Sequence, residues 1–406
     1  MDFGVLIAGT DANAYYMARC YYEKFGVKAL LLGHSPLPYT TYSSILTVKY
    51  DKSIWTQSGF LSAALKIKKE FGDKKVILIS SNETYADFIS KNKEELKNAG
   101  YVFNYPDTSL LKTLMFKEDF YKTYENSILD LPKTEYFDCS SPSEVSKDFS
   151  FPVILKPSNV IEYNHLSFAG KNKIYKIESY EELIKTISLI KNSGYKDKLI
   201  IQDFIPGDDS YLFDAVAYCS KDKKLKLLSF AQIGLQEHSK NMVGNAAVLI
   251  NGYNQFGGTD EICQKLKAFL EDIGYCGFAE FDLKYDYRDN KFKVLEINAR
   301  QGRSSYYITA LGCNPVSILA DDLIFDNCKD YGVLKDEVLL SFVPKGIIKK
   351  YIVNKEYKDK ALALFKKQHL NPLVFNKDKD FKRKLYLLKK NLRYYKEYKN
   401  AYWKVD

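Results

Sequence analysis

Short apolar runs alternate with helix-like segments over the first hundred residues of the chain. Residues 3–9 (FGVLIAG) form an apolar run closed by Gly9, and residues 12–25 carry apolar side chains at helical spacing. Three more strands are predicted at residues 27–33, 74–81 and 101–107, and a helix at residues 81–100, which has cap signals at its start and Gly100 at its end. Strands that alternate with helices predict an open parallel α/β sheet with helices on both faces, a Rossmann-like domain over residues 1–110.

The pattern changes after residue 110. A helical stretch at residues 109–129 leads to predicted strands at residues 151–157, 171–177 and 198–203, with a helix at residues 180–191. Further apolar strands follow at residues 212–220, 225–231, 277–286 and 292–298, with a helix at residues 259–273. Because hairpin-like and helical connections are mixed, this half is predicted to be α+β with antiparallel sheets. We expect one domain over residues 111–330, made of subdomains at about 111–205 and 206–330.

Composition limits the class of protein. A chain of 406 residues is too long for one ordinary core, so several packed domains are expected. No run of 18 apolar residues is present, and the N-terminus does not resemble a signal peptide. Seven scattered cysteines without a CxxC pair fit a reducing compartment and argue against structural zinc. The protein is therefore expected to be cytoplasmic.

The net charge of +9 is concentrated at the C-terminus, where residues 331–406 hold 20 Lys and Arg against 8 Asp and Glu. One interpretation of this basic extension is an amphipathic helix packed on the body of the protein. The other is attraction to anionic lipid at the inner membrane face, or to a pyrophosphate-linked precursor. No nucleic-acid-binding module is recognised, so nucleic acid is not expected as a partner.

Acidic side chains converge on a predicted hairpin. Residues 277–286 and 292–298 are strands joined by the turn YDYRDN, and alternation places Glu280, Asp282 and Lys284 on one face. Glu296 and Asn298 share a face of the partner strand. Carboxylate and amide oxygens are hard ligands of the kind that Mg²⁺ takes together with substrate phosphates. A polar face turned toward solvent is the alternative.

Other stretches suggest a nucleotide site without a P-loop. The strand FPVILKP ends in Lys156, whose ammonium group would reach phosphate oxygens or solvent. The strand LIIQDFIPGDD runs into a Pro-Gly turn followed by two acids, a hinge suited to adenine and ribose, or an ordinary strand exit. The first strand is followed by GTDANAYY rather than GxGxxG, so Thr10, Asp11 and Asn13 either line a substrate site or form a structural wall. The four histidines lack ligand spacing, and no nucleophilic triad is evident.

Taken together, these features resemble the ATP-grasp superfamily. Five phrases, in order over residues 3–330, are similar to the D-aspartate ligases of peptidoglycan synthesis: GTDANAYYMAR, FPVILKPSN, LIIQDFIPGDDS, GFAEFDLKYD and EINARQGRSS. The resemblance implies an N-terminal pre-ATP-grasp domain followed by an ATP-grasp fold. It also implies an ADP-forming carboxylate–amine ligase that uses ATP with one or two Mg²⁺, or Mn²⁺.

The resemblance also assigns roles to residues. Lys117, Lys156 and Lys173 (or its rival Lys171) would contact the phosphates of ATP. Gln202 and the backbones of Phe204 and Ile205 would hold the adenine, and Asp209 the ribose. Asp282, Glu296 and Asn298 would bind the metal, and Arg300 the acyl phosphate and the tetrahedral species that follows it. Substrate contacts are expected from Arg303, Ser304 and Ser305, and from Asp11 and Asn13.

The implied reaction activates an amino-acid carboxylate, D-aspartate in the resembled enzymes, as an acyl phosphate. The acyl phosphate is then attacked by an amine. In the resembled enzymes this amine is the lysine side chain of a UDP- or lipid-linked peptidoglycan precursor. A ligase of the same fold for another amino acid or small peptide is the alternative, and a non-catalytic nucleotide-binding protein is a further one. Neither the stereochemistry of the acid nor the oligomeric state follows from these residues.

Overall fold

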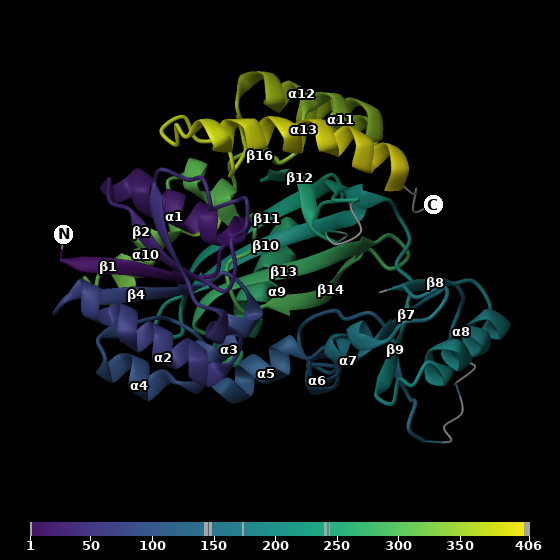
Figure 1. The fold of residues 1–406 in the computed structure, drawn as a ribbon. Helices are drawn as coiled ribbons and strands as arrows, with labels where there is room; N and C mark the ends of the chain where they lie inside the picture. The colour runs from purple at the N-terminus through teal and green to yellow at the C-terminus, as the bar shows by residue number, and fades with distance from the viewer. Residues whose placement is uncertain are drawn as a thin grey trace.

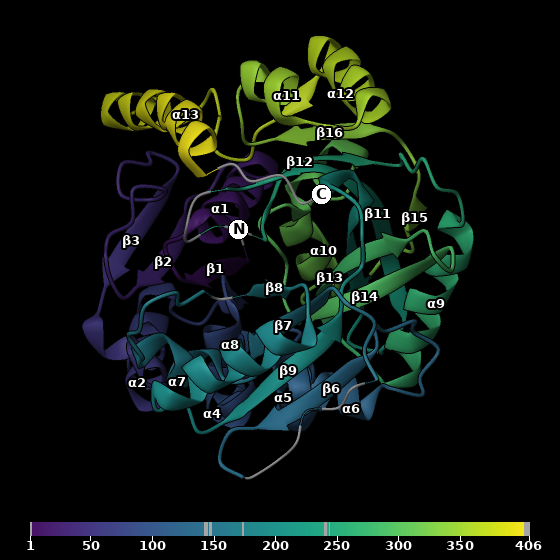
Figure 2. The same ribbon diagram turned by 90° about the vertical axis from the view of Figure 1, so that its right-hand side faces the viewer.

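The computed structural model describes residues 2–141, 145, 148–172, 174–238, 242 and 244–401. Its strands form three sheets (Figures 1 and 2), one in the N-terminal domain, a small one in the middle of the chain and a large one that continues into the C-terminal residues. Short 3-10 helices add single turns at Lys52–Trp55, Lys69–Phe71, Asp209–Tyr211 and Ser305–Leu311.

The first sheet is parallel and has the order β3-β2-β1-β4-β5. Its strands are β1 (Phe3–Ala8), β2 (Ala29–Gly33), β3 (Leu46–Tyr50), β4 (Lys75–Ser80) and β5 (Tyr101–Val102). Odd residues of β1 join the apolar cluster that contains α1 (Ala12–Phe25), and even residues join the cluster that contains α2 (Gln57–Lys68) and α3 (Glu83–Lys91). The predicted parallel sheet with helices on both faces is therefore confirmed.

Local details of this domain differ from the prediction. Strand β3 was not predicted, because its sequence has only one fully buried position and little apolar character. The helix predicted at residues 81–100 is broken into α3 and α4 (Lys93–Asn98) at Asn92, whose side-chain amide donates to the carbonyl oxygen of Phe88 at 2.7 Å. A side chain that competes for a backbone carbonyl ends the first helix there.

The second sheet is antiparallel with the order β6-β9-β7-β8, and it lies with α8 at one side of the molecule (Figure 1). It is formed by β6 (Thr134–Asp138), β7 (Val153–Pro157), β8 (Tyr175–Ile177) and β9 (Lys198–Asp203), with α7 (Val160–His165) and α8 (Tyr180–Asn192). This subdomain has its own apolar core. It is joined to the first domain through α5 (Thr108–Met115) and α6 (Lys117–Thr123), so the helix predicted at residues 109–129 is interrupted at Phe116.

The third sheet has eight strands, and its order is β14-β13-β10-β11-β12-β16-β17, with β15 beside β11. The strands are β10 (Leu212–Cys219), β11 (Leu225–Gln236), β12 (Ala246–Asn251), β13 (Gly277–Asp286), β14 (Lys291–Asn298), β15 (Gly332–Leu334), β16 (Val338–Ser341) and β17 (His369–Leu370). Helix α9 (Thr259–Asp272) packs on one face and α10 (Pro315–Leu323) on the other. The predicted hairpin of β13 and β14 is antiparallel, as expected.

The C-terminal residues are part of this body. Strands β15, β16 and β17 complete the third sheet, and they belong to the predicted basic C-terminal extension, residues 331–406. Helices α11 (Lys345–Tyr351), α12 (Lys355–Lys367) and α13 (Phe381–Ala401) form a layer above it (Figure 1). No helix within the described part of the chain is long and apolar enough to cross a membrane.

Candidate active site

Four of the predicted site residues line one cavity. A cavity of about 260 Å³ opens between the start of α3, the helices α5 and α6, and the end of β14. Its polar lining comes from Glu83, Lys117, Glu296, Asn298 and Arg300. The cavity therefore joins the N-terminal domain to the hairpin on which metal ligands were predicted.

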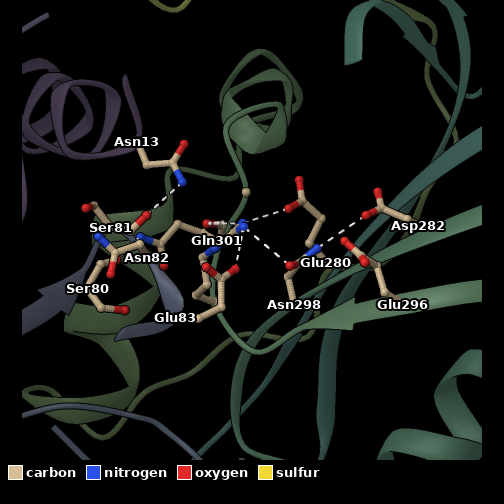
Figure 3. A network of polar contacts seen from close by, with 12 residues as sticks. Asn13, Ser80, Ser81, Asn82, Glu83, Glu280, Asp282, Glu296, Asn298 and Gln301 are labelled. Carbon is tan, nitrogen blue, oxygen red and sulfur yellow. Dashed lines mark hydrogen bonds and ion pairs between the residues drawn. The ribbon is translucent and has the colours of Figure 1, made fainter. Parts of the chain in front are cut away.

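The hairpin register places its polar residues in opposing pairs. Asp282 lies opposite Glu296, and Glu280 lies opposite Asn298. The Asn298 amide nitrogen is 3.4 Å from Asp282 Oδ2, and the Lys117 ammonium group forms an ion pair with Glu296. Figure 3 shows the four hairpin side chains next to each other, with Glu83 reaching toward them from the first domain. The predicted convergence of two acids and an amide is thus present.

The pKa values of the two acids of this site are shifted in opposite directions. Burial and the charge of Glu296 raise the pKa of Asp282 well above its usual range. Burial also opposes ionisation of Glu296, but Lys117 outweighs it and lowers the pKa of Glu296 to about 2. In the reverse direction, burial would lower the pKa of Lys117, yet the Glu296 carboxylate raises it. Lys117 therefore balances the charge of Glu296, which a divalent cation could balance as well.

These donors suit a metal that shares its shell with phosphates. In the part of the chain that the structure describes, no three His, Cys, Asp or Glu side chains form a ready-made metal cage. Two carboxylates and an amide are instead what Mg²⁺ takes when substrate oxygens and water complete its octahedron. Asp282 and Glu296 lie opposite each other in the hairpin register, and this is the arrangement that fits a cation between the two acids.

A second basic group lies across the cleft on the second sheet. Lys156, at the end of β7, donates to the side-chain oxygen of Gln202 at 2.9 Å, and Gln202 donates to the Thr134 hydroxyl at 2.8 Å. The Lys156 nitrogen lies 5.3 Å from the centre of the Tyr121 ring. Burial and repulsion by Lys117 lower the pKa of Lys156 to about 7. The structure thus brings together Lys117, Lys156 and Gln202, as predicted.

The predicted adenine hinge connects the second sheet with the third. Phe204 and Ile205 follow β9 and are buried. Asp209 is held by the third sheet, because its carboxylate accepts from the backbone and the side chain of Gln236, both at 2.8 Å. From β13, Lys284 donates to the Gly207 carbonyl at 2.9 Å. This bond fixes the hinge to the hairpin of β13 and β14, and the ribose role of Asp209 stays a prediction.

Arg300 links the hairpin to the N-terminal domain. Its guanidinium nitrogens lie 2.8 Å from Glu280 and 2.6 Å from Glu83. Burial would lower the pKa of Arg300, but these two carboxylates raise it further, so the charge is held at every accessible pH. Gly302 allows the approach, because a Cβ atom there would lie 1.5 Å from the Glu280 carboxylate. Glu280 thus positions this arginine.

The predicted residues of the first domain lie at the carboxyl ends of β1 and β4. Asp11 caps α1 and accepts from the Ala14 amide and from the Ser81 hydroxyl, both at 3.0 Å. Asn13 donates to the Ser81 carbonyl at 2.9 Å. Gln301, beside Arg300, donates to the Ser80 carbonyl at 2.6 Å. These bonds fix the domain edge against the arginine turn (Figure 3), while substrate contacts of Asp11 and Asn13 stay predictions.

The three remaining substrate candidates contact other parts of the protein and are not among the residues that line the cavity. Arg303 donates to Glu237 at 2.9 Å and to the Ala246 carbonyl at 2.8 Å, and it stacks on Phe342. The Ser304 hydroxyl lies within hydrogen-bond distance of two carboxylates, Asp214 at 2.6 Å and Glu280 at 2.8 Å. Ser305 accepts from the Gly302 amide. The geometry gives these three side chains structural partners, and their substrate role is untested.

The Ser304 hydroxyl has one hydrogen atom for two neighbouring carboxyl groups. A serine hydroxyl carries a single hydrogen, so it donates to one carboxylate only. Burial and the charge of Glu280 raise the pKa of Asp214 well above its usual range, which keeps a proton on this pair.

The lysine predicted on the phosphate-covering segment, Lys173, lies outside the described residues. Its rival Lys171 donates to the Leu166 carbonyl at 2.6 Å. The choice between them stays open.

Several site residues escaped prediction. Glu83 is the first residue of α3, and an acid in that position is explained locally by the helix dipole. Tyr121, Asp214 and Gln301 lie within buried or half-buried elements and match no short motif. The one available signal was the helical spacing of Tyr121 from Lys117, which puts the two side chains on one face of α6.

The chain is 35% identical over 395 residues to a D-aspartate ligase of Enterococcus faecium (strain Aus0004), a match that covers 94% of the chain and 92% of the relative. No protein-family model matches.

Two solved structures have similar folds. N5-carboxyaminoimidazole synthetase from Staphylococcus aureus has a TM-score of 0.60 at 12% identity, with 86% of each chain covered. An L-amino acid ligase from Bacillus licheniformis has a TM-score of 0.55 at 14% identity and covers 79% of this chain and 73% of its own.

The three-sheet fold and the site define an ATP-grasp enzyme, a carboxylate–amine ligase that forms ADP. Within that class, the chain belongs to the D-aspartate ligase family.

Proposed function

We propose that the protein joins D-aspartate, through its side-chain carboxylate, to the lysine amine of a peptidoglycan precursor. The observation that carries this proposal is the cavity in which Lys117, Glu296, Asn298 and Arg300 meet. Support for the particular substrates comes from the 35% identity, over nearly the whole chain, to a D-aspartate ligase.

The first step is attack of the amino-acid carboxylate on the γ-phosphorus of ATP, which forms an acyl phosphate and releases ADP. Lys117 and Lys156 bind the phosphates, and Gln202 with the backbones of Phe204 and Ile205 holds the adenine. Bound Mg²⁺, held by Asp282, Glu296 and Asn298, would neutralise charge on the transferring oxygens. Lys117 is then free to leave Glu296 for a phosphate oxygen.

The second step is attack of the amine on the acyl carbon. The bond to phosphate breaks, inorganic phosphate departs, and the amine loses a proton. Arg300 stabilises the anionic tetrahedral species, because Glu83 and Glu280 hold its guanidinium in place before the substrates arrive. Since positioning and charge stabilisation supply the catalysis, no covalent nucleophile is needed.

The test is a panel of D- and L-amino acids with ATP, Mg²⁺ and a UDP-linked precursor, followed by phosphate release and mass spectrometry. We expect phosphate release only when all components are present, and an adduct one aspartyl residue heavier with D-aspartate. An adduct with another amino acid would replace the proposed substrate but keep the ligase. Nucleotide binding without ADP formation across the panel would contradict both.

The metal assignment has a separate test. Glu296→Gln removes a carboxylate charge at almost constant size, and we expect turnover to fall by at least 10²-fold, as for loss of one strong transition-state contact. Glu261→Gln, an exposed acid of α9, is the matched control. Full turnover of Glu296→Gln would exclude a metal role for this residue.

A further inference from the structure

Helix α13 is fixed to the protein by its inner face. Arg383 is 1% exposed, pairs with Asp378 at 2.8 Å and donates to the Leu373 carbonyl. Near the other end of the helix, Tyr394 donates to Glu237 at 3.1 Å, and Tyr398 donates to the carbonyl oxygen of Gln236. Because buried polar contacts hold both ends, the orientation of the helix about its own axis is set.

The outer face of α13 carries an apolar stripe. It consists of five large side chains with exposed fractions from 41% to 77%: Phe381, Leu385, Leu388, Leu392 and Tyr395. Their spacing alternates between four and three residues, so at 3.6 residues per turn they lie within an arc of roughly 80°. The anchoring residues Arg383, Tyr394 and Tyr398 lie on the opposite side of the helix. The stripe therefore faces outward because the inner face is already occupied.

Basic side chains flank this stripe. Six exposed cations lie along α13, at Lys382, Lys384, Lys389, Arg393, Lys396 and Lys399. Glu397 is the one acid of the helix, and it pairs with Arg393 at 2.9 Å. An apolar stripe bordered by cations, on a helix lying along the surface, is the arrangement of helices that bind in the plane of a lipid interface.

We infer that α13 docks the protein onto an anionic lipid surface. The apolar stripe would enter the boundary between headgroups and acyl chains, and the lysines would contact lipid phosphates. A second copy of this chain fits the stripe less well, because pairing two such helices would bring their cations together without acids between them. The inference concerns the outer face of α13, so it stands apart from the ligase proposal.

The experiment uses the full chain and sedimentation with vesicles of phosphatidylcholine alone or mixed with phosphatidylglycerol, at low and high salt. One variant removes the stripe (Phe381→Ser, Leu388→Ser, Leu392→Ser), and another reverses three charges (Lys382→Glu, Lys389→Glu, Lys396→Glu). The matched control reverses three exposed lysines near α2, at the opposite end of the molecule from α13 (Figure 1): Lys52→Glu, Lys66→Glu and Lys69→Glu. All substituted side chains are exposed, so we expect every variant to fold, and circular dichroism checks this.

We expect the wild type and the control to bind the phosphatidylglycerol vesicles at low salt, and binding to weaken at high salt. The charge-reversal variant replaces three cations by acids near the lipid phosphates, so it should bind at least about tenfold more weakly, and loss of the apolar stripe should have a similar effect. Failure of the wild type to bind at low salt would overturn the inference. So would equal loss of binding in the control, or self-association of the wild type that the stripe variant abolishes.

Discussion

Arg300 and Arg303 are three residues apart on one turn, and both guanidinium groups are buried against glutamate. Arg300 lines the cavity between Glu83 of the first domain and Glu280 of the hairpin. Arg303 points instead to Glu237 and to the ring of Phe342, beneath helix α13. Two identical side chains in one motif thus have different surroundings, which are set by elements distant in sequence.

The largest expected effect is on stability. Arg303→Met leaves Glu237 buried without its partner, and we expect a loss of ~3–5 kcal/mol in the free energy of unfolding. Chemical denaturation measures it, and adding Glu237→Gln should recover a large part of the loss. If stability were unchanged and the KM for the amino acid rose instead, Arg303 would be a substrate contact, as its place in the motif first predicted.

Arg300→Ala should act on the reaction instead. Loss of one preorganised donor to an oxyanion costs about 10²–10³-fold in turnover, so kcat should fall by that factor while the KM for ATP changes little. The assay is ADP release, with circular dichroism to confirm folding. A reduction below tenfold would place the acyl phosphate elsewhere.

Glu83→Gln tests whether the first domain positions Arg300. The isosteric amide keeps a hydrogen bond but loses the ionic pair, which corresponds to roughly tenfold in kcat. Glu94→Gln, an exposed acid on the neighbouring α4, serves as the control and should behave as wild type. Equal activity of both variants would leave Glu83 as a helix-start residue only.

The smallest expected effect concerns proton uptake by Lys156. Its pKa is about 7, whereas the two arginines stay charged. Because this pKa is depressed below the unfolded value near 10.5, the unfolded chain binds more protons, and this group makes stability rise between about pH 7 and 10.5. Phosphates favour the charged form, so ATP binding near pH 8 should take up a proton. Calorimetry in buffers of different ionisation enthalpy measures the uptake, and Lys156→Met should abolish it.

The contrast between Arg300 and Arg303 also shows which parts of the structure could be predicted from the sequence. Helix α1 and strand β13 have the predicted bounds, because periodicity and turns are local signals. The opposition of Asp282 and Glu296 follows from the alternation of one hairpin. Glu83 and Glu237 could not be assigned, since nothing near them in the chain records the arginine that each one meets in space.

Residues 303–305 show a different limit of the sequence. The resemblance to D-aspartate ligases implied that Arg303, Ser304 and Ser305 contact substrate, and this role stays a prediction. In the structure, Ser304 contacts Asp214, and Arg303 contacts Glu237, which also accepts a hydrogen bond from Tyr394 of α13. These side chains of the turn therefore have partners within the protein. A polar residue shows only that it needs a partner, and the partner can belong to the protein.

Strand β12 pairs with β16, and β16 with β17, so the large sheet is completed by residues near the C-terminal end of the chain. The hairpin of β13 and β14 is synthesised before these strands. Until residue 341 emerges from the ribosome, β12 lacks its partner β16, and its open edge is a surface on which other chains can pair. Helix α13 is synthesised later still, and its Tyr394 donates to Glu237, the partner of Arg303. A product truncated before β16 would therefore expose the edge of its central sheet to proteases and to other chains.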